Sequence, residues 1–462
     1  MRKTNRKYPV EKVIFIFFIL AFCGYIFSRF MVHKRPNVIL ITLDSLRPDH
    51  LGCYGYQRAT SFNMDKVAEE GAIFSEAVAQ GSHTSVSNPS LITSSYPNKH
   101  HVRYWGDSLP LGMPTLAEIL RRHGYQTAFI SDQYAISLIK GIERGFVTYN
   151  AISALSYEQR SKVIDITDWA IKWLKDNKGK KIFLWLYYLA PHGPYYLSSY
   201  YRNLFINDPL YYKANKVLGL GSNFFDQSGI GVIPRYLAEG SLRDVDYYLA
   251  QYDAQLRYTD DQIGRLIEEL KKLKIYNDTL IIITSDHGES LGERNIYFCH
   301  GTSLYDELIR IPLLVKMKGF SPANSKIDAQ VRSIDIAPTI LDMLDISPPP
   351  SMQGVSLLPL LSGKTNRFDQ VSFSEMGSRV CLRTKERKLI YDRDSHRYEF
   401  YNLLNDPLEL NNMIDLNSPE IESLKSSLDE YLSDKDCLVP QDLKPDLDRE
   451  EELKLRSLGY AQ

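Results

Sequence analysis

Short apolar runs alternate with helical patterns along most of the chain. Runs rich in β-branched and aromatic residues predict buried strands at 38–43, 127–131, 181–189, 281–285 and 311–316. Apolar residues spaced for one face of a helix predict helices at 115–123, about 160–176, about 242–273 and 334–344. Strands separated by helices in this way are typical of an α/β fold, in which helices flank a mostly parallel central sheet.

The pattern changes after a proline-rich break at 347–351. Downstream, short alternating segments predict antiparallel strands at 370–373, 380–384, 388–392 and 398–401, followed by a helix at 419–432. This arrangement predicts a smaller C-terminal α+β subdomain. The charged tail at 442–456 predicts an exposed helix or arm. We therefore expect a main domain at 36–346 and a C-terminal subdomain with its tail at 347–462.

The N-terminal segment predicts a membrane anchor. Residues 13–32 are apolar over about the thickness of a bilayer, and Arg29 near the end of the run can snorkel. The twelve preceding residues carry five basic side chains against one acid, Glu11. This excess favours a cytoplasmic basic segment and membrane anchor within residues 1–35 and an extracytoplasmic main domain. Lys34 and Arg35 on the far side oppose this orientation. A cleaved signal peptide or lipoprotein processing at Cys23 is the alternative to a single-pass anchor.

Overall composition excludes few functions. The chain has 462 residues, of which 44% are hydrophobic, so it can bury a large core. Its formal net charge of -1 gives no reason to expect a nucleic-acid partner. The five cysteines lack metal-binding spacing and do not identify the redox compartment. Oligomeric state stays open.

Acidic residues follow two of the predicted strands. Asp44 comes directly after the strand at 38–43, and Asp286 and His287 come together after the strand that begins near Ile281. In an open α/β sheet, ligands and catalytic groups collect beyond the carboxyl ends of the strands. Each aspartate could instead cap the following helix. The pair of strand ends, one carrying a histidine, favours a metal site.

Several ordered motifs resemble a known family. They are DSLRPDHLGCYGY after the first strand, a helix-opening segment that ends in LITSSYP, the turn APHGPY, and TSDHGESLGE followed by HGTSLYDELIRIPLLV. Together they resemble the sulfatase branch of the alkaline phosphatase superfamily over residues 36–344. Further downstream, RYEFYNLLNDPLELNN resembles the C-terminal subdomain of that family. The resemblance implies an alkaline phosphatase-like fold and a hydrolase of sulfuric or phosphoric esters.

The resemblance also implies a set of site residues. Asp44, Asp286 and His287 would bind one divalent metal ion, and the family's nucleophile position falls on Thr84. The metal-bound hydroxyl of Thr84 would complete the shell and attack sulfur or phosphorus in line. From the residues alone, Thr84 or Ser85 could simply cap a helix.

Two histidines match further positions of the family. His192 in APHGPY and His300 in FCHGTS correspond to groups that bind the ester oxygens or protonate the leaving group. A lone histidine is otherwise more often structural. Their positions beside strand ends favour the functional interpretation.

The sequence departs from the sulfatase pattern at the nucleophile. Sulfatases carry a C/S-x-P-x-R motif whose first residue becomes formylglycine, whereas residues 84–88 here are TSVSN. We therefore expect no formylglycine. Ser45 stands where the family has a second acid, and the expected lysine near His300 has no match. The lower negative charge favours manganese or zinc over calcium, although all three stay open.

Three functions are compatible with these residues. The first is a membrane-anchored, metal-dependent hydrolase of a sulfuric or phosphoric ester. The second is a phosphoethanolamine- or phosphoglycerol-type transferase that uses the same Thr84 adduct. The third is a sulfatase-like protein that binds without catalysis. The substrate's organic part could be a glycan or a lipid headgroup, and the sequence does not identify it.

Overall fold

The computed structural model describes residues 35–151, 166–195, 197–206, 208, 215–222, 229–319, 323–416 and 418–433, with residues 449, 451 and 455. Asn37–Gln462 belong to one compact unit. Within the described part of the chain, no helix combines the length and apolar character needed to cross a membrane. The predicted anchor at 13–32 lies outside the described residues.

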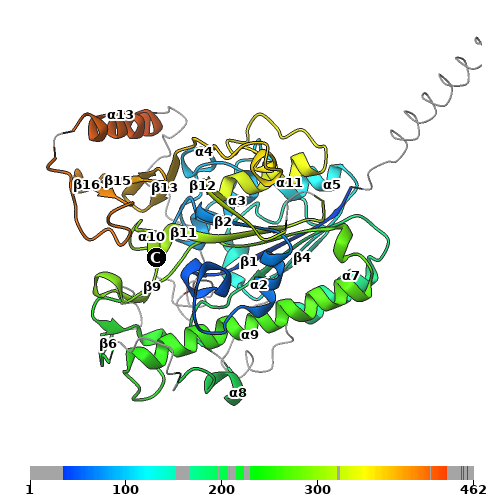
Figure 1. Cartoon of the computed structure of the whole chain (residues 1–462), viewed down its shortest axis with the longest axis horizontal. Helices are drawn as coiled ribbons and strands as arrows, with labels where there is room; N and C mark the ends of the chain where they lie inside the picture. The colour runs from blue at the N-terminus through cyan, green and yellow to red at the C-terminus, as the bar shows by residue number, and fades with distance from the viewer. Residues whose placement is uncertain are drawn as a thin grey trace, which may run out of the picture. The chain divides into compact units, whose positions relative to one another are not determined.

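An eight-stranded sheet forms the centre of the molecule, in the order β12-β2-β11-β8-β1-β5-β3-β4 (Figure 1). Its strands are β1 (Asn37–Leu43), β2 (Ala72–Val78), β3 (Gln126–Ser131), β4 (Thr148–Ala151), β5 (Ile182–Tyr188), β8 (Thr279–Ser285), β11 (Arg310–Lys316) and β12 (Ser325–Arg332). β11 runs antiparallel to both of its neighbours, β2 and β8, and the other pairs are parallel. The sheet is therefore mixed, with one reversed strand in the predicted parallel arrangement.

Helices cover both faces of this sheet because its strands are buried on both sides. On β1, Val38 and Leu40 belong to one core cluster, and Ile39 and Ile41 belong to the other. The first cluster includes side chains of α3 (Thr84–Thr93), α5 (Leu116–Arg122) and α11 (Ile336–Met343). The second includes side chains of α2 (Phe62–Glu69), α7 (Ile166–Asp176) and α9 (Val245–Lys272). Figure 1 shows the long helix α9 beneath the sheet and α3 and α11 above it.

Local sequence signals explain where several helices begin. Thr115 and Glu118 form a reciprocal capping box at the start of α5. The side chain of Asp244 caps α9 by accepting a hydrogen bond from the backbone N–H of Asp246, and the helix begins at Val245, three residues after the predicted start. α7 begins at Ile166, and part of the helix predicted from about residue 160 lies outside the described residues. The main predicted helices are thus confirmed where they are described.

The C-terminal part forms the predicted α+β arrangement. β13 (Ser372–Met376), β14 (Arg379–Arg383), β15 (Arg387–Asp392) and β16 (Arg397–Asn402) make an antiparallel sheet in chain order. α13 (Pro419–Ser433) packs on this sheet through Ile421 and Leu428. The predicted exposure of the tail is wrong at Leu455, because its side chain is buried in the main core.

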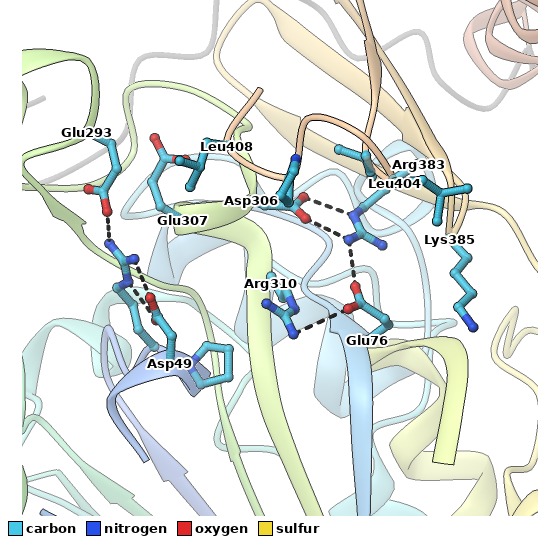
Figure 2. Close-up of a pocket in the computed structure, with 14 residues that line it drawn as sticks. Asp49, Glu76, Glu293, Asp306, Glu307, Arg310, Arg383, Lys385, Leu404 and Leu408 are labelled. Carbon is cyan, nitrogen blue, oxygen red and sulfur yellow. Dashed lines mark hydrogen bonds and ion pairs between the residues drawn. The ribbon is translucent and has the colours of Figure 1, made fainter. Parts of the chain in front are cut away.

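Buried ion pairs join the C-terminal sheet to the main sheet. Arg383 of β14 contacts Asp306 over 2.6 Å and Glu76 of β2 over 2.7 Å, and Glu76 also contacts Arg310 over 3.2 Å. Figure 2 shows these charges around a cavity of about 290 Å³. The predicted site residues do not line this cavity. Most of its charged groups form ion pairs, so we assign it to the junction between the two sheets.

Candidate active site

Two adjacent strands bring three predicted metal ligands together. Asp44 follows β1, and Asp286 and His287 follow β8, which is parallel to β1 with Leu43 opposite Ser285. One ligand atom from each of the three residues lies within 4.8 Å of the others, and all three side chains are buried. The carboxyl ends of the parallel strands therefore meet at one edge, as the sequence predicted.

Thr84 lies at the same edge. It is the first residue of α3, and its Oγ1 is 3.2 Å from Nε2 of His287. The same nitrogen lies 3.6 Å from Oδ1 of Asp44 and 3.5 Å from Oδ2 of Asp286. The expectation that Thr84 or Ser85 caps the helix is wrong, because the side chain of His83 accepts a hydrogen bond from the backbone N–H of Ser85. The Thr84 hydroxyl is left to face the other predicted ligands.

The turn after β8 fixes the orientation of His287. Its Nδ1 donates to the carbonyl oxygen of Gly288 over 2.9 Å, so the lone pair of Nε2 faces Thr84 and the two aspartates. A Cβ atom at Gly288 would lie 2.1 Å from the carbonyl oxygen of Glu307. Only glycine fits this close approach, which explains the glycine that follows the Asp-His pair.

Polar neighbours hold both carboxylates in place. Oδ2 of Asp286 accepts hydrogen bonds from Tyr187 over 2.8 Å and from Asn88 over 3.1 Å. Oδ2 of Asp44 accepts one from Nε2 of Gln133 over 2.9 Å. Such partners orient ligands and tune the affinity of a metal site.

Sequence reasoning did not assign these three positioning roles. Gln133 is the second residue after β3, so the strand-end rule could have identified it. Tyr187 lies within the apolar run of β5 and gave no comparable signal. Asn88 stands at the arginine position of the sulfatase motif, and its role depends on a contact across the fold.

Four imidazole rings pack together at the site, and one of them is the predicted ligand His287. The rings of His287 and His300 stack with their centroids 4.4 Å apart, and His192 lies 4.9 Å from His300. His83, which the sequence analysis did not consider, lies 5.8 Å from His300. A Cβ atom at Gly301, where φ is +68°, would approach the His83 ring to 3.0 Å. Both predicted histidines therefore lie at the site, with His83 as a third neighbour of His287.

Burial and close packing determine the charge of these groups. Burial, followed by the charge of Asp286, raises the pKa of Asp44 well above its ordinary value. Burial, with the neighbouring His287 and His192, lowers the pKa of His83 to about 3. Burial and the surrounding imidazoles likewise lower the pKa of His300 well below its ordinary value. Burial thus favours the neutral rings of His83 and His300.

A buried carboxyl and an arginine border the imidazole cluster. Oε1 of Glu289 lies 3.3 Å from Nδ1 of His300. Burial, followed by the charge of Asp44, raises the pKa of Glu289 well above its ordinary value. The Arg47 guanidinium donates to the backbone carbonyl of Glu289 and pairs with Asp49 and Glu293. Glu289 is therefore placed to orient His300.

The donor atoms suit a divalent ion. Two carboxylates, one imidazole and one hydroxyl converge, and the distances from Nε2 of His287 to the other three donors are 3.2–3.6 Å. Bonds of about 2.1 Å in a tetrahedral shell place neighbouring donor atoms about 3.4 Å apart. Asp44, Asp286, His287 and Thr84 could thus contact one ion with little movement.

Comparisons with known proteins agree with this geometry. The family model described as Sulfatase matches residues 36–346, and the model of the C-terminal part of N-sulphoglucosamine sulphohydrolase matches residues 294–437. The chain is 24% identical to an N-acetylglucosamine-6-O-sulfatase of Bacteroides thetaiotaomicron, over 82% of this chain and 83% of that protein.

Solved structures share the fold. A protein solved in complex with its substrate D-glucosamine-2-N,6-O-disulfate has a TM-score of 0.73 and 23% identity, covering 87% of this chain and 98% of the other. The phosphonate monoester hydrolase of Silicibacter pomeroyi has a TM-score of 0.71 and 20% identity, covering 86% of this chain and 95% of the other. Together with the match of the Sulfatase model to most of the chain, these observations mean that the protein belongs to the sulfatase family of ester hydrolases.

Proposed function

We propose that this protein hydrolyses a phosphoric ester through a covalent adduct on Thr84. The observation that carries the proposal is the convergence of Thr84 Oγ1 on Nε2 of His287, 3.2 Å away, beside two buried aspartates. A hydroxyl needs such surroundings because it is a weak nucleophile at its ordinary pKa. A divalent ion held by Asp44, Asp286 and His287 would lower that pKa and offset the charge of the ester.

The chain's own residues support each part of the reaction. Thr84 begins α3, where the helix dipole favours negative charge. His192 and His300 lie close together beside His287. The ring of His300 can donate a hydrogen bond to an ester oxygen, whereas Nδ1 of His192 already donates to the carbonyl oxygen of Gly193. Glu289 orients the ring of His300. These groups surround the position that the ester would occupy over Thr84.

The proposed reaction has two steps. First, Thr84 Oγ1 forms a bond to phosphorus while the bond to the leaving alcohol breaks. The leaving oxygen receives a proton from His300, and the proton that Thr84 Oγ1 gives up replaces the one that His300 has donated. Second, a water molecule attacks phosphorus, the bond to Thr84 breaks, and one proton of that water passes to Thr84 Oγ1. The products are an alcohol and the corresponding phosphorus acid.

The nucleophile favours phosphorus over sulfur. In the sulfatase pattern, a formylglycine hydrate can release sulfate by breaking its own carbon–oxygen bond. Thr84 has a methyl group on Cβ, and its residue cannot become an aldehyde. A sulfated threonine would therefore need direct attack on sulfur, whereas a phosphorylated one can be opened by water at phosphorus. A sulfuric ester remains the alternative substrate within the same site.

We further propose that residues 13–32 anchor the protein in a membrane with the hydrolase on the extracytoplasmic side. The proposal rests on the length and apolar character of that segment and on the basic residues before it. Relatives named for sugar sulfates make glycan esters the first natural compounds to test. Alkaline extraction of membranes tests the anchor, because an anchored protein stays in the pellet.

Turnover by the purified full-length protein tests the proposed chemistry. The substrates are an aryl sulfate, a phosphate monoester, a phosphodiester and a phosphonate monoester, each with manganese or zinc and with or without an added alcohol acceptor. Thr84→Ala should lose at least about a thousandfold in kcat/KM. Thr93→Ala removes another buried hydroxyl from α3 and is the matched control. Equal turnover by wild type and Thr84→Ala would overturn the proposal.

A further inference from the structure

The charge of the site distinguishes between classes of phosphorus ester. We infer that the site selects esters with one negative charge, namely phosphodiesters and phosphonate monoesters, over phosphate monoesters with two. This inference rests on the proposed function at Thr84 and adds the substrate class. It follows from the charged groups that the fold places around the nucleophile.

The metal ligands leave no surplus positive charge. Asp44 and Asp286 contribute two negative charges, which a divalent ion would balance to zero. Because these side chains are buried, water screens an additional charge only weakly. Each further negative charge on the substrate therefore raises the cost of binding.

Two arginines near the site are engaged elsewhere. Arg47 donates to the backbone of Glu289, and its guanidinium pairs with Asp49 and Glu293. Arg103 accepts a hydrogen bond from Ser85 through its carbonyl oxygen, while its guanidinium pairs with Glu375 over 2.8 Å. Neither pairing directs positive charge toward Thr84.

Asn88 occupies the place where the family motif carries an arginine. Its Nδ2 donates to the carbonyl oxygen of Thr84 over 3.2 Å and to Oδ2 of Asp286 over 3.1 Å. The side chain is neutral and its amide group faces the carboxylate. The position that could supply a cation next to the nucleophile thus serves to hold a metal ligand.

Imidazoles supply the remaining polar contacts. The ring centroid of His287 lies 4.4 Å from that of His300 and 6.5 Å from that of His83, and His192 lies 4.9 Å from His300. Rings this close place several hydrogen-bonding nitrogens in a small volume. Such a set can bind the two free oxygens of a singly charged ester. Neutral imidazoles carry no positive charge, so they do not balance the second negative charge that a phosphate monoester brings.

Paired kinetics at pH 8 test the inference. A phosphate monoester carries two charges there, because its second pKa is about 6. We expect kcat/KM for bis(4-nitrophenyl) phosphate and for 4-nitrophenyl phenylphosphonate to exceed that for 4-nitrophenyl phosphate by at least about tenfold. Asn88→Arg should shift the ratio toward the monoester by about tenfold or more, and Asn88→Met, which also removes the amide but adds no charge, should not.

A binding measurement compares the affinities of the esters without the contribution of their different intrinsic reactivities. Manganese-loaded Thr84→Ala protein should bind the diester more tightly than the monoester in titration calorimetry, and the experiment is also available if Asn88→Arg fails to fold. Equal or tighter binding of the monoester would overturn the inference while the proposed hydrolysis stands. If wild type turns over none of the phosphorus esters and Thr84→Ala binds none, the proposed function itself fails.

Discussion

The hydroxyl of Tyr187 donates a hydrogen bond to Oδ2 of Asp286 over 2.8 Å. Tyr187 belongs to β5 and Asp286 follows β8, and β1 lies between these strands. The contact therefore links a proposed metal ligand to β5, the strand beyond β1. It restricts the carboxylate to one orientation at the sheet edge.

Replacing Tyr187 with phenylalanine should weaken metal binding. The change removes one hydrogen-bond donor to Oδ2 of Asp286 and leaves Asn88 as another. Loss of such a partner typically costs about 10–100-fold in metal affinity. Tyr188→Phe is the matched control, because Tyr188 is the next residue of β5 and its hydroxyl contacts Thr167 instead. Manganese or zinc titration measures the change, and equal affinity of Tyr187→Phe and wild type would contradict it.

Removing the metal should lower the stability of the folded protein. An ion that binds the native site at 100 times its Kd stabilises the fold by about 2.7 kcal/mol. We expect a chelator to lower the thermal midpoint and added manganese or zinc to restore it. Asp286→Asn should remove the metal-dependent part of the shift. An unchanged midpoint of the wild-type protein in all three conditions would argue against a resident ion.

The buried ion pairs at the sheet junction should make a large contribution to stability. Nζ of Lys388 is fully buried between Asp306, 2.5 Å away, and Glu409, 2.7 Å away. Lys388→Met leaves both carboxyl groups without this partner and should cost about 3–5 kcal/mol in urea unfolding. Lys172→Met removes an exposed pair with Asp176 and should cost less than about 1 kcal/mol. Similar losses for the two variants would contradict this assignment.

The protein should carry an unmodified threonine at position 84. Oxidation of a threonine side chain gives a ketone, so threonine cannot form the formylglycine aldehyde. Thr84→Cys should also retain its thiol, because Val86 and Asn88 replace the proline and arginine of the family motif. Mass spectrometry of the peptide that contains residue 84 measures both outcomes. An aldehyde on the cysteine variant would show that the motif is dispensable here.

The strand-end rule predicted that Asp44, Asp286 and His287 would meet at one edge of the sheet. Asp44 and the Asp286-His287 pair follow buried apolar runs, and parallel neighbours bring such ends together. The same rule extends to Gln133 after β3. By contrast, the direction of β11 could not be predicted, because a buried apolar strand has the same sequence pattern in either orientation.

Other features depend on contacts between distant parts of the chain. The capping role of His83 requires its side chain to turn toward Ser85, and histidine is not a preferred capping residue. In the first half of β12, the exposed residues Lys326 and Asp328 alternate with half-buried ones. The strand therefore lacks the continuous apolar run that indicated the inner strands. Tyr187 gains its role only when β5 and β8 assemble around β1.

The most direct test of Thr84 as the nucleophile is acid quenching during turnover of a phosphorus ester, followed by mass spectrometry. The account predicts a phosphorus adduct on the peptide that contains Thr84 in wild type and in the Thr93→Ala control. It predicts loss of the adduct and of turnover in Thr84→Ala. An adduct on another residue, or turnover by Thr84→Ala at the wild-type rate, would contradict the account.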